Sequence, residues 1–112
     1  AVAALEKNIE SFEFAQQINT RQADFFDISP PPGPAGTIVL NPPYGKRLKQ
    51  AEGVRKFYRQ IGTKLKADFA GYRLGIVLPS RTLAKHLGMR LKLTSVFHGG
   101  ATVFIGTGRI EP

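Results

Sequence analysis

The tetrapeptide Asn41-Pro42-Pro43-Tyr44 brings together groups that suit chemistry on an amine. The side-chain oxygen of Asn41 and a backbone carbonyl can each accept one amine hydrogen. Two acceptors held close together would turn the nitrogen lone pair toward an electrophile. The two prolines stiffen the backbone, so little conformational freedom is lost when a substrate is positioned. The tetrapeptide therefore indicates a site that orients an exocyclic amine.

Tyr44 adds a flat aromatic face to this tetrapeptide. Enzymes that modify a base take it out of the stack and hold it against aromatic or apolar side chains. An amine that attacks an activated methyl group in line needs no Cys, metal or strong general base. The alternative is an ordinary turn at the end of a strand, because Asn-Pro is a common turn dipeptide. The four residues together favour a site for a base amine over a simple turn.

The position of the tetrapeptide along the chain supports the same interpretation. It follows residues 37–40, Thr-Ile-Val-Leu, a short apolar run rich in β-branched residues. Such runs are typical of strands buried on both faces in a parallel sheet. The strand ends at the prolines, which cannot donate to a ladder. Ligands of α/β sheets bind beyond the carboxyl ends of strands, so Asn41 stands where a site is expected.

The positive charge of the chain is concentrated just after this motif. The 112 residues carry a net charge of +8, and residues 46–66 contain eight basic residues and one acid, Glu52, a net charge of +7. Phosphate binding requires such a concentration of charge, although a solubilising helix face would also produce it. The basic residues are Lys46, Arg47, Lys49, Arg55, Lys56, Arg59, Lys64 and Lys66.

The hydrophobic pattern predicts the elements that position these residues. The clearest helix covers residues 52–69, with an apolar stripe formed by Val54, Phe57, Tyr58, Ile61, Leu65 and Phe69. The other elements follow from periodicity and turn residues. They are a helix over 1–14, a weak strand over 16–22, a loop over 29–36, a strand over 73–78, a helix over 81–87, and strands over 90–97 and 101–110.

The order of these elements predicts an α/β fold. Strands that alternate with helices imply parallel pairing with helical crossovers. The last two strands are joined at His98-Gly99-Gly100, a good hairpin turn, which implies one antiparallel strand. We therefore expect a mostly parallel sheet that ends in a C-terminal antiparallel hairpin.

Composition excludes several other classes of protein. The chain has no Cys, so it can form neither a disulfide framework nor a thiolate metal site. No apolar run approaches the roughly 20 residues that a membrane span needs. The first residues lack the basic start and long apolar stretch of a signal peptide. We expect a cytoplasmic location, with neither metal nor membrane as a partner.

The stretch Ile38 to Leu48 resembles the catalytic motif of S-adenosylmethionine-dependent amino-methyltransferases. Its continuation, Tyr44-Gly45-x-Arg47-Leu48, is similar to bacterial ribosomal RNA guanine-N2 methyltransferases rather than to adenine-N6 DNA enzymes. Looser matches extend over nearly the whole chain. They are Ala4, Asn8, Phe57-Tyr58, Gly62, Leu65, Gly71-Tyr72-Arg73 and Leu87-Gly88.

This resemblance implies a partial Rossmann-like methyltransferase sheet, S-adenosylmethionine as cofactor and RNA as partner. Asn41, Pro42 and Tyr44 would be catalytic, and Asn41 would also lie against the cofactor. Asp24 occupies the position of the acid that bonds the cofactor's adenine amine, and Phe25 would line the adenine pocket. Without the resemblance, a turn or helix cap is an equally good role for Asp24. The residues expected to bind nucleic acid are Lys46, Arg47, Lys49, Arg55, Lys56 and Arg59.

Several parts of the family's catalytic domain are not found in the chain. They are the first strand, the Gly-rich cofactor loop and the acid that holds the ribose, and a typical member also has an N-terminal RNA-binding module. Residues 1–112 therefore resemble the C-terminal portion of a catalytic domain, with the N-terminal half of the same enzyme as its partner. In the family's sheet, the missing strands would leave residues 16–22 without a neighbour and residues 37–40 with an unpaired edge.

Three functions that involve nucleic acid remain open from the sequence. The leading one is methyl transfer from S-adenosylmethionine to guanine N2 of ribosomal RNA, with this chain inactive by itself. The second is adenine-N6 methylation of DNA or RNA, which shares the tetrapeptide and is distinguished by the base modified. The third is a non-catalytic basic RNA-binding remnant, which is distinguished by its failure to bind the cofactor.

Overall fold

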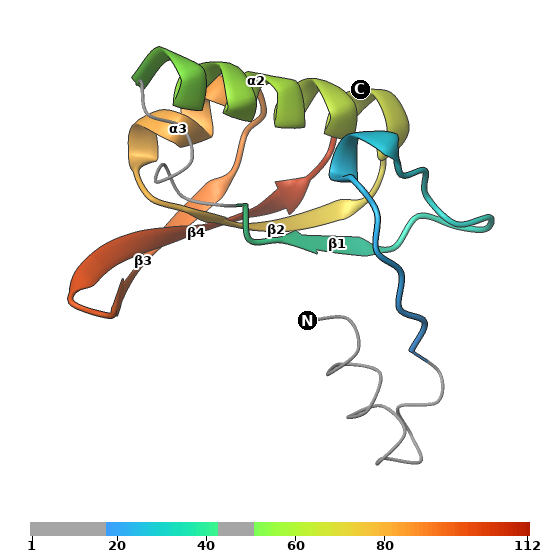
Figure 1. Ribbon diagram of the computed structural model, residues 1–112, viewed down its shortest axis with the longest axis horizontal. Helices are drawn as coiled ribbons and strands as arrows, with labels where there is room; N and C mark the ends of the chain where they lie inside the picture. The colour runs from blue at the N-terminus through green and yellow to red at the C-terminus, as the bar shows by residue number, and fades with distance from the viewer. Residues whose placement is uncertain (1–17, 43–50) are drawn as a thin grey trace.

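The computed structural model describes residues 18–42 and 51–112, except for the side chains of residues 51, 52 and 98. The predicted helix over residues 1–14 lies outside the described residues, as do Tyr44, Lys46, Arg47 and Lys49. The described elements, shown in Figure 1, follow in chain order. They are the 3-10 helix η2 (Phe25–Asp27), β1 (Thr37–Leu40), α2 (Ala51–Asp68), β2 (Arg73–Leu78), α3 (Arg81–His86), β3 (Lys92–His98) and β4 (Ala101–Arg109).

The four strands form one sheet in the order β1-β2-β4-β3. β1 pairs with β2 in parallel, and β4 pairs with both β2 and β3 in antiparallel directions. The predicted α/β class and closing hairpin are confirmed. The balance of directions differs from the expectation of a mostly parallel sheet, because one of the three pairings between described strands is parallel. The reason is that β4 inserts between β2 and β3, so both of its pairings are antiparallel.

The hairpin turn follows from its two glycines. His98 pairs with Ala101, which leaves Gly99 and Gly100 as a two-residue loop. Their φ angles are +60° and +79°, as a type I′ turn requires at both central positions. This backbone conformation favours glycine, and its twist matches that of the paired strands.

The hydrophobic core lies between the sheet and one layer of helices. Figure 1 shows α2 and α3 on the same face of the sheet. The predicted apolar stripe of α2 supplies much of the core, with Tyr58, Ile61, Leu65 and Phe69 buried and Val54 and Phe57 partly buried. Alternate residues of β2, namely Leu74, Ile76 and Leu78, meet this stripe. Burying residues of this size stabilises the fold by about 1.5–3 kcal/mol each, so the stripe fixes α2 on the sheet.

The opposite face of the sheet is not covered by any described element. Val39 of β1 is 75% exposed and Ile105 of β4 is 38% exposed on this face. β1 is an edge strand among the described residues, since β2 is its one neighbour. Among the described strands, residues 37–40 therefore have the predicted unpaired edge.

The weak strand predicted over residues 16–22 is wrong for its described part. Residues 18–22 belong to no strand, and Ile18 is 52% exposed. A strand needs a neighbour for its backbone N–H and C=O groups, and the described sheet ends at β1 without reaching these residues. The apolar Ile18 in this short polar segment is not enough to form a strand without a neighbouring strand to pair with.

Candidate functional site

Asn41 and Pro42 follow β1 directly, at the carboxyl end of a strand that runs parallel to β2. Asn41 is exposed, whereas Pro42 is buried. The ring of Pro42 ends the strand, and the amide of Asn41 remains accessible beside it. The structure therefore places the described half of the tetrapeptide where the strand pattern predicts a ligand site.

A pocket of about 220 Å³ opens at this end of the sheet. Most of its lining is apolar, and the amide of Asn41 is the polar side chain among the lining residues. Pockets of this kind use a few polar groups to orient a ligand that apolar walls enclose. The lining residues are Phe25, Phe26, Leu40, Asn41, Pro42, Phe57 and Ile61.

Aromatic rings connect the η2 turn to α2 beside this pocket. The rings of Phe25 and Phe26 meet edge to face, with centroids 5.2 Å apart. Phe26 meets Phe57 of α2 in the same way at 6.1 Å, and Phe57 meets Tyr58 at 5.7 Å. Pairs with this geometry contribute about 0.5–1.5 kcal/mol beyond their buried area. The pocket wall is therefore a packed aromatic row.

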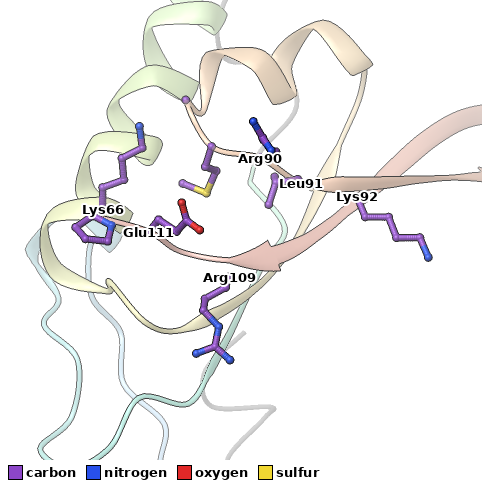
Figure 2. A pocket seen from close by; sticks show the side chains of 9 residues that line it. Lys66, Arg90, Leu91, Lys92, Arg109 and Glu111 are labelled. Atoms are coloured by element: carbon purple, nitrogen blue, oxygen red, sulfur yellow. The ribbon is translucent and has the colours of Figure 1, made fainter.

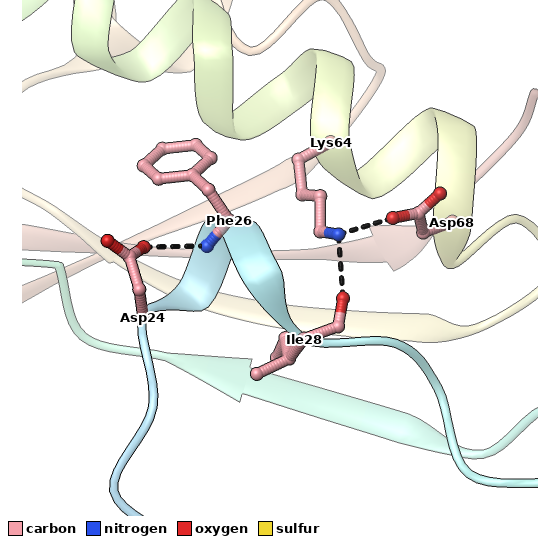
Figure 3. A network of polar contacts seen from close by, with 5 residues as sticks. All are labelled: Asp24, Phe26, Ile28, Lys64 and Asp68. Carbon is pink, nitrogen blue, oxygen red and sulfur yellow. Dashed lines mark hydrogen bonds and ion pairs between the residues drawn. The ribbon is translucent and has the colours of Figure 1, made fainter.

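Asp24 determines the local shape of the η2 turn. Its Oδ1 accepts a hydrogen bond of 2.9 Å from the backbone N–H of Phe26, as Figure 3 shows, and its carbonyl accepts one of 3.0 Å from Asp27. This is the capping role that the sequence left open beside cofactor binding. A carboxylate has about four acceptor positions, so capping leaves Oδ2 able to accept an amine hydrogen. The geometry is compatible with both roles.

Lys64 anchors the end of the turn to α2. Its Nζ donates a hydrogen bond of 2.6 Å to the carbonyl oxygen of Ile28 and forms an ion pair with Asp68 (Figure 3). The side chain of Lys64 is 13% exposed, so the contact is largely shielded from water. A basic residue from the segment predicted to bind phosphate therefore has a structural partner.

The other described basic residues of α2 lie away from the core. Lys56 and Arg59 are exposed, and Arg55 is partly exposed. Arg59 Nη1 lies 3.4 Å from His86 Nδ1, which places the two side chains together between α2 and α3. Arg55, Lys56 and Arg59 thus share the N-terminal half of α2 with the pocket residue Phe57.

Sequence reasoning missed Phe26 as a pocket residue and assigned Phe57 and Ile61 only to the core. Phe26 is separated from Phe57 by about thirty positions, and no local pattern links them. The signal that could have found Phe26 is its place in a three-residue turn after a capping acid, because an aromatic residue in an exposed turn is unusual without a partner.

Within residues 18–42 and 51–112, no three His, Asp or Glu side chains are grouped so that they could hold a metal ion. No helix in the same ranges is long and apolar enough to cross a membrane.

Comparison with known proteins identifies relatives of this sequence. Residues 1–102 match the family model described as RMKL-like, methyltransferase domain. A protein of Synechocystis named "Putative RNA methyltransferase" is 35% identical over 89 residues, which are 80% of this chain and 23% of that protein. The "Ribosomal RNA large subunit methyltransferase K/L" of Cellvibrio japonicus is 30% identical over 102 residues, which are 88% of this chain and 14% of that protein. The chain thus spans less than a quarter of the length of these relatives.

The fold also matches a solved structure. A crystal structure described as "a putative methyltransferase complexed with SAH" superposes with a TM-score of 0.80 and 19% sequence identity. The match covers 99% of this chain and 29% of that one. At this identity, the likeness shows the fold.

Proposed function

The chain belongs to the family of RMKL-like methyltransferase domains, and we propose that it is the C-terminal portion of a cytoplasmic enzyme that methylates RNA. The reaction transfers a methyl group from S-adenosylmethionine to an exocyclic base amine. Guanine N2 of large-subunit ribosomal RNA is the proposed target, in line with the Tyr44-Gly45-x-Arg47-Leu48 continuation and the names of the K/L relatives.

The observation that carries this proposal is the single pocket shared by Phe25 and Asn41. The family resemblance assigns Phe25 to the adenine of the cofactor, and the tetrapeptide motif assigns Asn41 to the amine of the substrate. These residues come from separate elements, η2 and the end of β1. Their convergence on one pocket is what a transfer between two ligands requires, because the donor and the acceptor must meet.

The described residues fit part of the cofactor. The pocket of about 220 Å³ is smaller than the roughly 300–1,000 Å³ of complete small-molecule sites. Its aromatic lining suits one flat heterocycle, and Asp24, which directly precedes the lining residue Phe25, has a second carboxylate oxygen that can accept from an adenine amine. When bound, S-adenosylmethionine supplies a methyl group activated by a sulfonium. The remaining cofactor contacts are proposed to come from the rest of the enzyme, including a Gly-rich loop.

The residues of the motif act on the substrate amine. The side-chain oxygen of Asn41 accepts one amine hydrogen and a nearby backbone carbonyl accepts the other, which holds the nitrogen in one orientation. Positive charge develops on this nitrogen during transfer, so both contacts strengthen in the transition state. The buried ring of Pro42 keeps Asn41 in place, and Tyr44 provides the face on which the extruded base stacks.

The basic residues around the site hold the RNA backbone. Arg55, Lys56 and Arg59 would contact phosphates beside the pocket, together with Lys46, Arg47 and Lys49. Their contribution is electrostatic and independent of sequence, so they position the RNA and leave the choice of base to the pocket.

A methylation assay on unmodified large-subunit ribosomal RNA tests this function in the complete protein that carries these residues. Radiolabelled S-adenosylmethionine would report transfer, and mass spectrometry of the digested RNA would identify the modified nucleoside. We expect N2-methylguanosine. N6-methyladenosine would replace the proposed base with the adenine alternative. RNA binding without cofactor binding or transfer would support the non-catalytic alternative.

A further inference from the structure

A second, larger pocket of about 640 Å³ lies at the opposite end of the sheet's strands from Asn41. Four cationic side chains and one acid line it, which Figure 2 shows in close-up. Lys66 comes from the last turn of α2, Arg90 and Lys92 come from the start of β3 and the segment before it, and Arg109 ends β4. The acid is Glu111, so the ionised side chains give the pocket a surplus of three positive charges.

The register of the sheet fixes the distance between this pocket and the candidate active site. Arg109 is level with Arg73, the first residue of β2, whereas Leu40, just before Asn41, is level with Ile76. The separation is roughly 10 Å along the strands and a further 10 Å across them. The two sites therefore face different parts of any ligand that reaches both.

Arg73 and Arg109 form an unfavourable pair at the same end of the strands as this pocket. They are direct partners in the antiparallel pairing of β2 and β4, so their Cβ atoms are about 4.5–5.5 Å apart on the same face. Like charges in this arrangement are destabilising. They line a third pocket, of about 520 Å³, together with Thr37 and Thr107, and its lining contains no acid. Arg109 lines both pockets, so the two cationic pockets share one guanidinium side chain.

We define the cationic rim as Lys66, Arg73, Arg90, Lys92 and Arg109. Arg73, Arg90, Lys92 and Arg109 are exposed, and Lys66 is partly exposed. None of the five side chains forms an ion pair or hydrogen bond with another described residue. Five cations without an ion-pair partner among the described residues, two of them placed side by side by strand pairing, favour an anionic ligand.

We propose that the cationic rim binds the phosphodiester backbone of the RNA substrate, away from the nucleotide that is methylated. This inference rests on RNA being the substrate. Phosphate is favoured because guanidinium groups donate paired hydrogen bonds to it. The lining of both pockets lacks an aromatic side chain on which a base could stack, so the rim contacts the backbone and not the bases. The rim determines how a long RNA lies across this end of the sheet while one base occupies the pocket beside Asn41.

The test compares two double variants of the complete protein that each lose two positive charges. Arg73→Gln/Arg109→Gln changes the rim. Arg21→Gln/Lys85→Gln is the control, since both of its residues are exposed and lie outside all three pockets. Filter binding with unmodified large-subunit ribosomal RNA, across a series of KCl concentrations, gives the affinity and its salt dependence.

We expect the rim variant to bind RNA roughly tenfold more weakly, with the slope of log affinity against log salt reduced by about 1.4–1.8. The control variant should stay close to the wild type. The melting temperature of the rim variant without RNA should be unchanged or higher, because a like-charge pair has been removed. Equal loss of affinity in both variants would overturn the proposal, since only net charge would then matter.

Two further outcomes separate this proposal from others. A lower melting temperature with unchanged RNA binding would mean that an acidic part of the same protein neutralises the rim, and the proposal would be wrong. Methyl transfer is measured separately at saturating RNA, where the rim variant should keep the wild-type turnover. If the wild type binds RNA through the rim but methylates no base, the proposed function fails while the rim remains.

Discussion

The ammonium group of Lys64 donates a hydrogen bond of 2.6 Å to the carbonyl oxygen of Ile28, 36 residues earlier in the chain. The η2 turn is held by polar contacts on both sides. The cap formed by Asp24 lies before it, and the bond from Lys64 to Ile28 lies after it (Figure 3). Phe25 and Phe26 lie between the two ends. The orientation of the pocket's aromatic wall thus depends on a cation of α2.

Replacing Lys64 by Met should loosen this turn while retaining the apolar stem. We expect the free energy of unfolding to fall by about 1–2 kcal/mol, because the carbonyl of Ile28 loses a charged donor. The amides of Asp27 and Ile28, which bond within the turn, should exchange with solvent faster. Asp68→Asn is the control, since it removes the ion pair and keeps the bond to Ile28. Equal amide exchange rates at Asp27 and Ile28 in Lys64→Met and Asp68→Asn would show that Lys64 does not hold the turn.

Gly62→Ala should destabilise the protein although alanine is the better helix former. A Cβ at Gly62 would lie 2.0 Å from the carbonyl oxygen of Leu87, a backbone atom that cannot move aside without shifting α3. The overpacking should cost about 1–3 kcal/mol, more than the roughly 1 kcal/mol gained in helix propensity. Gly53→Ala in the same helix is the control, because a Cβ there would meet no described atom within 4 Å apart from its chain neighbours and the adjacent helix backbone. It should stabilise the protein, and urea unfolding of both variants measures the difference.

Asn41→Ala in the complete protein should lower turnover far more than RNA affinity. The lost acceptor acts mainly in the transition state, so the cost is on the order of 3 kcal/mol, or about a hundredfold in rate. Tyr44→Phe keeps the aromatic face and should retain most activity, whereas Tyr44→Ala should weaken binding and rate by roughly 1–3 kcal/mol in total. Steady-state kinetics distinguish these patterns. Near-normal turnover of Asn41→Ala would refute the amine-orienting role.

Replacing Arg55, Lys56 and Arg59 together by Ala should weaken RNA binding across sequences. Each lost phosphate contact reduces the slope of log affinity against log salt by about 0.7–0.9, so the triple variant should lose about 2–3. Salt titrations on two unrelated RNAs measure this, with Arg21→Ala/Lys85→Ala as the comparison. An unchanged slope would place the main RNA contacts elsewhere on the protein.

The 112 residues alone should bind S-adenosylmethionine weakly or not at all. The described pocket is large enough for one ring, and Asp24 and the Asn41 region are the expected contacts. Calorimetric titration of the purified chain checks this directly. Micromolar affinity would mean that the chain contains a more complete cofactor site than we infer.

Local patterns were sufficient to predict most elements of the fold. The stripe from Val54 to Phe69 predicted α2 because one face of a helix recurs every three or four residues. The apolar runs before Asn41 and after Tyr72 predicted β1 and β2, and Gly99-Gly100 predicted the hairpin because both positions need positive φ. Each of these signals lies within a few residues of the element that it describes. The position of Asn41 at a strand end was predictable for the same reason.

Other features depended on which elements become neighbours, and only the tertiary structure decided them. Residues 18–22 form no strand because a strand requires a partner, and β4 makes the sheet less parallel than expected by inserting beside β2. Phe26 contacts Phe57, and Arg73 pairs with Arg109, although the two residues of each pair are more than thirty positions apart in the sequence. Sequence determined what each segment could become, since propensity and turn chemistry act locally. Packing and strand register determined which side chains share a pocket, because those contacts form only when the chain folds.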